Sequence, residues 1–245
     1  MIYFNKILFS FILTVFLYGF SARAQEIPTE LQKAYEGFDA TIGIQNTDIF
    51  TGIEYIEKHR MVNEKHKFFG SDLYVPTTVF YEGQPYFKIP VRYNIFDDLL
   101  LVKLPSQRGE TEFQLFPNRL DGFYLNSRKF INVYEADSDI SGIYELLYED
   151  PQLQVLKKYR VSQQKISRRE LVHYEFKQKS SEYFFKYKNN YYELNRGNLL
   201  ELFPEHKSEV REYYRDYRKQ ARVQQDGALV AMFQRLSNLS NAAAQ

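Results

Sequence analysis

From about residue 53 to residue 194 the chain repeats one rhythm, in which short apolar and aromatic runs are separated by turn residues. Three windows show it most clearly, residues 80–87, 123–130 and 185–192, because each carries aromatic residues on both sides of a short polar turn. Ring pairs across neighbouring strands stabilise antiparallel hairpins. The rhythm therefore predicts three hairpins of one style.

The segments between these windows alternate apolar and polar residues, as at residues 91–95 and 153–161. Such alternation is typical of strands with one solvent-exposed face. Asp97-Asp98 and Glu149-Asp150-Pro151 supply further turns. We therefore expect residues 53–194 to form an antiparallel β meander, and the sequence leaves open whether it is a sandwich or a curled sheet.

A short helix is predicted before this β domain, within residues 25–52. Thr29-Glu30-Leu31-Gln32 matches a capping box, in which the Thr hydroxyl and the Gln amide satisfy free backbone donors at a helix start. The expected helix covers residues 30–36 and ends at Gly37.

The period becomes helical after Leu194, which predicts a helical module over residues 195–240 and a disordered tail over residues 241–245. Asn198 with Glu201 is expected to cap a first short turn, and Asp226 to cap the last helix. That last helix places four apolar residues at helical spacing: Leu229, Met232, Phe233 and Leu236. The predicted fold class is thus α+β, an antiparallel β meander with a C-terminal helical module.

The helix expected over residues 205–222 separates its residues into an apolar, a basic and an acidic face. The apolar face contains Val210, Tyr213, Tyr214, Tyr217 and Ala221. The basic face contains Lys207, Arg211, Arg215, Arg218 and Arg222. This basic face could bind an anionic lipid head group, a polyanionic glycan or an acidic partner. The alternative is a solvated face whose last cations compensate the helix dipole.

The first residues have the three parts of a secretory signal peptide. Lys6 precedes an apolar run over residues 7–20, and Ala22-Arg23-Ala24 resembles a cleavage site. The run is shorter than the roughly 20 apolar residues that span a membrane. We therefore expect cleavage after Ala24 and an exported protein, periplasmic or secreted, that does not span the membrane after cleavage.

The net charge and the absence of cysteine argue against several classes of function. Removal of residues 1–24 leaves 30 of the 32 basic residues against 31 acidic ones, so the mature chain lacks the positive excess that nucleic-acid binding requires. The chain has no cysteine, which excludes disulfides and a thiol nucleophile. Neither G-x-S-x-G nor H-E-x-x-H is present, which lowers the expectation of an enzyme, although a pair of carboxylates could still converge in the fold.

Two segments resemble cation sites incompletely. Asp137, Asp139 and Ser141, followed by Gly142, match the opening of a calcium loop, with Glu145 as a further candidate ligand, but Tyr148 stands where the loop needs a bidentate Glu. The alternative is an acidic surface turn. The triplets Glu57-Lys58-His59 and Glu64-Lys65-His66 could offer transition-metal ligands, yet the lysines beside them favour a solvated connection. No other cofactor is expected.

Several segments together resemble a family of exported, β-rich proteins of Gram-negative bacteria that has no assigned activity. They are YEGQPYFKIPVRYNI at residues 81–95, followed by Asp98-Leu99-Leu100, GIYELLY at residues 142–148 and NLLELFP at residues 198–204. The resemblance implies a periplasmic or surface location and carries no catalytic residue. We expect a non-catalytic envelope component that binds a partner protein or an apolar or glycan ligand; the alternative is a hydrolase of envelope material with a carboxylate pair.

Overall fold

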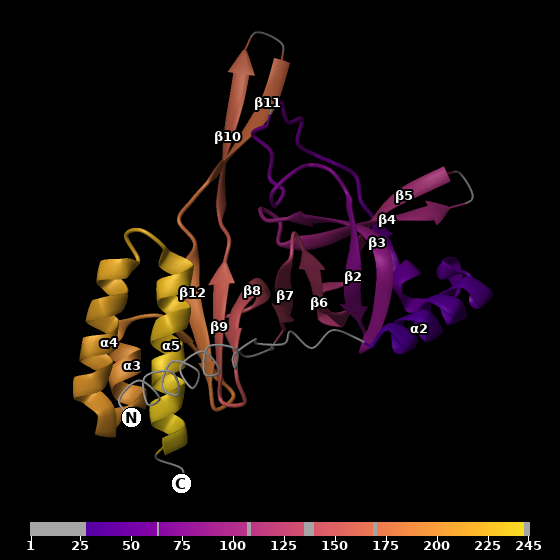
Figure 1. The fold of residues 1–245 in the computed structure, drawn as a ribbon. Helices are drawn as coiled ribbons and strands as arrows, with labels where there is room; N and C mark the ends of the chain where they lie inside the picture. Colours follow the sequence, from indigo (N-terminus) through magenta and orange to yellow (C-terminus); the bar gives the residue numbers. More distant parts are fainter. Residues whose placement is uncertain (1–27, 63, 107–108, 135–139, 169–170, 243–245) are drawn as a thin grey trace, which may run out of the picture.

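A computed structural model describes residues 28–62, 64–106, 109–134, 140–168 and 171–242. Its centre is one antiparallel sheet of eleven strands in the order β1-β5-β4-β3-β2-β6-β7-β8-β9-β12-β13 (Figure 1). The strands are β1 Gly52–Glu54, β2 Val75–Tyr81, β3 Gln84–Asn94, β4 Leu99–Ser106, β5 Gly109–Leu115, β6 Leu120–Leu125, β7 Arg128–Val133, β8 Gly142–Glu149, β9 Leu153–Lys158, β12 Glu182–Tyr187 and β13 Asn190–Glu193. The predicted α+β class and meander are confirmed, in the form of a single open sheet.

All three predicted hairpins are present, as β2–β3, β6–β7 and β12–β13. Their two-residue turns are Glu82-Gly83, Asn126-Ser127 and Lys188-Asn189, and all six residues have positive φ, between 47° and 74°. Positive φ at both central positions is the turn conformation that matches the twist of the flanking strands. The turns therefore fix the register of each hairpin locally.

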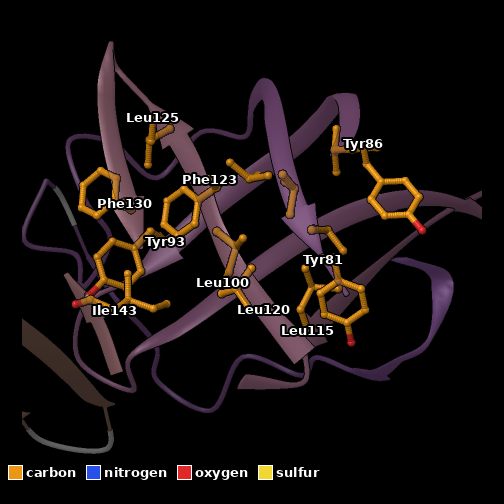
Figure 2. Packing of buried hydrophobic residues seen from close by; sticks show 14 of the residues in the cluster. Tyr81, Tyr86, Tyr93, Leu100, Leu115, Leu120, Phe123, Leu125, Phe130 and Ile143 are labelled. Carbon is orange, nitrogen blue, oxygen red and sulfur yellow. The ribbon is translucent and has the colours of Figure 1, made fainter. Parts of the chain in front are cut away.

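The first half of the sheet folds around an aromatic core (Figure 2). Tyr93 of β3 meets Phe123 of β6 and Phe130 of β7 at ring-centroid distances of 5.8 and 5.6 Å, and the two phenylalanines stack at 4.9 Å. Each of these side chains is at most 1% exposed. Burying a side chain of this size contributes about 1.5–3 kcal/mol, so these rings hold β3, β6 and β7 together.

The C-terminal helices α3 Arg196–Leu202, α4 Lys207–Gln220 and α5 Gln225–Ala242 pack against the other half of the sheet (Figure 1). The four apolar positions predicted for the last helix are all at most 3% exposed. The predicted caps are wrong: Asn195 caps α3 through the backbone amide of Asn198, and Asp226 lies inside the first turn of α5. Helix α5 ends two residues beyond the boundary predicted at residue 240, and residues 243–245 lie outside the described part.

The N-terminal helix α2 runs over Thr29–Ile42, longer than predicted. Gly37 does not end it, because this exposed helix tolerates the roughly 1 kcal/mol that an interior glycine costs. The helix ends instead before Gly43, whose φ of 82° leaves the helical conformation. The capping box is absent: Thr29 is already helical, and Gln32 donates its side-chain hydrogen bond to Glu36.

A feature without a sequence prediction is a two-stranded hairpin, β10 Val161–Arg168 with β11 Leu171–Gln178, which we call the arm. It leaves the sheet between β9 and β12 and projects above it (Figure 1). Lys158 at the end of β9 pairs directly with Glu182 at the start of β12. The arm is therefore an insertion between two strands that are neighbours in the sheet.

Candidate functional site

The predicted basic face of helix α4 surrounds a concavity, which we call the basic hollow, with a volume of about 840 Å³. Four of the five predicted residues line it: Arg211, Arg215, Arg218 and Arg222. Lys207, at the start of α4, does not. Arg196 from α3 and Lys219 from α4 add two cations that the sequence did not indicate. Six cations therefore surround one space: Arg196 of α3, four residues of α4, and Arg222 in the turn after it. Helix α4 covers Lys207–Gln220, two residues shorter at each end than the predicted range 205–222.

Residues of the predicted apolar face also line the basic hollow: Tyr214, Tyr217 and Ala221. Tyr217 is 7% exposed and packs with Val210 into the core under the helices. Tyr214 lies beside it, with a ring-centroid distance of 5.7 Å. Burial raises the pKa of Tyr217, so its hydroxyl stays protonated at neutral pH and available as a hydrogen-bond donor. The lining of the hollow thus combines tyrosine rings with guanidinium groups.

The cations of the hollow have no acidic partner within the described part of the chain. None of its lining residues is acidic, and the ion pairs of the described residues do not include Arg196, Lys219 or the four predicted arginines. On the acidic face of α4, Asp216 forms an ion pair with Arg235 of α5 at 3.4 Å, and not with a cation of the hollow. Uncompensated charge of one sign around a concavity concentrates the electric field there and attracts anions.

An ion pair at the start of α5 fixes the helices against the sheet beside this hollow. The Asp226 carboxylate accepts a hydrogen bond from the Lys157 ammonium of β9 at 2.6 Å and another from the Tyr183 hydroxyl of β12 at 2.7 Å. Burial and then this carboxylate raise the pKa of Tyr183 well above its usual range. Gln225, the residue before Asp226, lines the basic hollow. The two bonds of Asp226 therefore position this part of the lining.

The calcium-loop prediction is only partly within the described residues. Asp137 and Asp139 lie outside them, and the loop stays a prediction. Glu145 is described: it is buried in β8, where its carboxylate accepts hydrogen bonds from Arg128 at 2.7 Å and from the Tyr159 hydroxyl at 2.5 Å. Ser141 precedes β8 and accepts, through its backbone carbonyl, a hydrogen bond from the Tyr144 hydroxyl.

The histidine triplets are also engaged with protein groups. His59 Nδ1 lies 3.1 Å from the ammonium of Lys67, which also binds Glu57 and Asp97 at 3.0 Å each. His66 Nδ1 accepts a hydrogen bond from the amide of Phe68. No cluster of three or more His, Asp or Glu residues suited to a metal ion occurs among the residues that the structure describes.

Sequence reasoning found the row of arginines but missed the neighbours that complete the hollow. The row is visible in the sequence because residues 211, 215, 218 and 222 recur at helical spacing on one helix. Arg196 belongs to another helix, and Gln225 follows a turn, so their approach depends on how α3, α4 and α5 pack. No local signal marks Arg196, because the acidic residues around it, such as Glu193 and Glu201, outnumber the basic ones.

Two further findings concern the whole chain. Within the described residues, every helix is too short or too polar to cross a membrane. The predicted signal peptide, residues 1–24, lies outside the described part. No protein-family model, no curated protein and no solved structure gives a significant match to this chain.

Proposed function

We propose that the mature chain is an exported, non-catalytic component of the bacterial envelope that binds an anionic glycan in the basic hollow. The observation that carries this proposal is the set of six cations around one concavity whose lining contains no carboxylate. The envelope location rests on the leader at residues 1–24 and on the resemblance of residues 75–205 to exported proteins.

The chemistry of the hollow favours carboxylate or phosphate groups presented on sugars. A guanidinium group is planar and donates two parallel hydrogen bonds to such an anion, which a lysine ammonium does not. The half-buried ring of Tyr214 adds apolar area beside the cations, suited to the face of a sugar. A concave site also admits a protruding ligand better than the flat surface of a bilayer, which could not reach all six cations together.

The hydrolase alternative requires two carboxylates about 5–9.5 Å apart across a pocket. The basic hollow contains neither of them. Its groups are cations and phenols, which bind and orient an anion without taking a proton from water at neutral pH. This site therefore supports binding.

The direct test measures the affinity of the chain without residues 1–24 for polygalacturonate, a polymer of uronic acids, by isothermal titration calorimetry. In the double variant Arg211→Glu/Arg215→Glu we expect the affinity to fall at least about tenfold, because two attractive charges become repulsive. The affinity of the wild-type chain should also fall when ionic strength rises from about 0.1 M to about 1 M, since the Debye length shortens from about 10 to about 3 Å.

The matched control is Lys33→Glu/Lys165→Glu, which makes the same change in net charge at exposed lysines of α2 and the arm. It should bind as the wild type does. Equal losses in both double variants would mean that only net charge matters, and the proposal would be wrong. Binding to phosphatidylglycerol vesicles but not to polygalacturonate would equally overturn it in favour of a membrane surface.

A further inference from the structure

A second concavity, of about 1170 Å³, lies at the base of the arm, and we call it the arm cleft. One wall is the loop of residues 64–72, and the other comes from the arm, where Phe176 and Gln178 line it. Lys157 of β9, Tyr159 just after this strand and Asn126 in the β6–β7 turn complete the lining. Sites for discrete ligands commonly have volumes of about 300–1,000 Å³, so this cleft has room for an extended ligand.

Both walls of the arm cleft are held in place by backbone hydrogen bonds. The loop binds β3 through the amides of Phe69 and Ile95, at 2.9 and 3.0 Å from their carbonyl partners. It binds the arm through the amide of Phe176, which donates to the carbonyl of Lys65 at 3.0 Å. A salt bridge between Lys65 and Glu175 at 2.7 Å adds to this contact. The cleft is therefore formed before any ligand arrives, which reduces the entropy lost on binding.

The approach of the loop to the β6–β7 turn depends on Gly70. Its φ is 72°, and a Cβ atom there would lie 2.8 Å from the side-chain nitrogen of Asn126. Only glycine adopts this conformation and leaves this space without strain. Two features position the side-chain amide of Asn126 in the lining of the cleft. One is the positive φ of Asn126, 50°, and the other is the close approach of Gly70.

The polar groups of the arm cleft are oriented by a buried network. Arg128 donates from one nitrogen, Nη1, to Glu145 at 2.7 Å and to the Tyr159 hydroxyl at 3.0 Å. Its side chain is 43% exposed, and a guanidinium has donors on all three nitrogens, so Nε and Nη2 can bind a ligand. Burial and the Glu145 carboxylate raise the pKa of Tyr159, which keeps its hydroxyl protonated.

The charge of the arm cleft differs from that of the basic hollow. The two lining cations, Arg128 and Lys157, are neutralised by carboxylates outside the lining, Glu145 and Asp226. The lining itself adds two exposed carboxylates, Glu64 and Asp72. A net anionic ligand therefore gains little here. The half-buried ring of Phe69, together with the hydrogen-bonding groups of the lining, suits a ligand that is uncharged, has an apolar face and carries many hydroxyl groups.

We propose that the arm cleft binds an uncharged saccharide, with a sugar face against the half-buried Phe69 and hydroxyl groups bonded to Arg128, Asn126 and Gln178. Phe69 and Tyr159 already pack edge to face at 4.8 Å, so their positions do not need to change on binding. This site lies on residues separate from those lining the basic hollow and goes beyond the function proposed above.

The test uses the chain without residues 1–24 and three neutral hexasaccharides, made of α-linked glucose, β-linked glucose and N-acetylglucosamine. Binding is measured by isothermal titration calorimetry and by saturation-transfer NMR, which reports which sugar protons contact protein. We expect at least one to bind, and the double variant Asn126→Gly/Gln178→Ala to weaken that binding about tenfold by removing two hydrogen bonds. Glycine at residue 126 keeps the left-handed turn, so the hairpin is preserved.

The matched control is Asn189→Gly/Gln164→Ala, since Asn189 also has positive φ, at the second position of the β12–β13 turn, and Gln164 is exposed on the arm. It should bind as the wild type does, and so should Arg211→Glu/Arg215→Glu. If none of the three sugars binds at a concentration of about 10 mM, the proposal is wrong, because even a weak specific site with a Kd of about 1 mM would be mostly occupied at that concentration. Binding that both double variants retain, or a preference for tripeptides over every sugar, would overturn it as well.

Discussion

Lys67 shows how a single buried charge organises the loop beside the arm. Its side chain is 1% exposed, and its ammonium binds Glu57 and Asp97, while His59 Nδ1 lies 3.1 Å away. A lysine almost never lies so deep in a protein without paired charges. The ammonium thereby joins the segment before the loop to the β3–β4 turn, which contains Asp97.

We expect Lys67→Met to lower the free energy of unfolding by about 3 kcal/mol at neutral pH, since breaking a buried ion pair leaves charges without a partner. Burial raises the pKa values of Glu57 and Asp97, but hydrogen bonds lower them more, and Lys67 is a donor to both, so the net pKa of each is below its ordinary value of 4.5 or 3.8. Carboxylates with lowered pKa stabilise the fold above these values and lose that contribution as pH falls through the folded pKa. The difference in the free energy of unfolding between the wild type and Lys67→Met should therefore become smaller below about pH 4.5.

Urea denaturation followed by tyrosine fluorescence at neutral pH and at several values below pH 4.5 checks this expectation. Lys88→Met is the matched control, because its ion pair with Glu36 is on the surface, with the lysine 74% exposed. Surface pairs contribute about 0–1 kcal/mol, so this variant should change little. A Lys67→Met variant as stable as the wild type at neutral pH would contradict the assigned role of this ammonium.

At the scale of elements, the helices and the sheet meet through one polar cluster within a large apolar interface. Phe185 of β12 and Phe233 of α5 are both fully buried and pack at 5.3 Å. Asp226 fixes the position of α5 relative to the sheet, because its carboxylate binds Lys157 and Tyr183 on two adjacent strands. Apolar packing alone tolerates sliding, whereas these two bonds select one position of α5 along the sheet.

We expect Asp226→Asn to lower the free energy of unfolding by about 1.5–3 kcal/mol, because Lys157, with its side chain 11% exposed, loses a charged hydrogen-bond partner. Asp216→Asn in the same helical hairpin breaks the exposed pair with Arg235 and should cost less than about 1 kcal/mol. Guanidinium denaturation of both variants provides the measurement. Equal effects would show that the Asp226 cluster does not hold the helices.

At the scale of the whole molecule, the arm is an insertion that the sheet can lose. Strands β9 and β12 pair over six residues without it, from Lys158 with Glu182 to Leu153 with Tyr187. The arm contacts the loop through Lys65 and also the segment before the loop, where His59 packs against Tyr174 and Phe176 at 4.9 and 5.7 Å. The arm therefore shapes the cleft more than it supports the sheet.

Replacing residues 161–178 by a short Gly-Ser turn should leave one cooperative thermal transition, with Tm lowered by about 5–10 °C because Phe176 and its partners lose their burial. Circular dichroism and differential scanning calorimetry measure this. The comparison is deletion of residues 182–193, strands β12 and β13, which should prevent folding because it removes the strands that the helices cover. Loss of folding in the arm variant would contradict the view of the arm as an insertion.

Much of the local structure was predictable from particular residues. The hairpins follow from polar turns between aromatic residues, and the buried face of α5 follows from Leu229 and its helical repeats. Of the basic hollow, the four arginines at residues 211, 215, 218 and 222 were predictable. The buried pairs of Lys67 and Glu145 were not, since their partners are distant in sequence and nothing local distinguishes a buried Lys or Glu from a surface one.

The sequence by itself determined the strands, the turns and the faces of the helices, because backbone conformation and side-chain periodicity depend on residues close along the chain. Only the tertiary structure decided that β6 lies beside β2, that the arm leaves the sheet and that Arg196 joins the arginines of α4. These arrangements depend on how buried area and paired charges balance across the whole molecule. That balance involves contacts between distant segments, which no local pattern specifies.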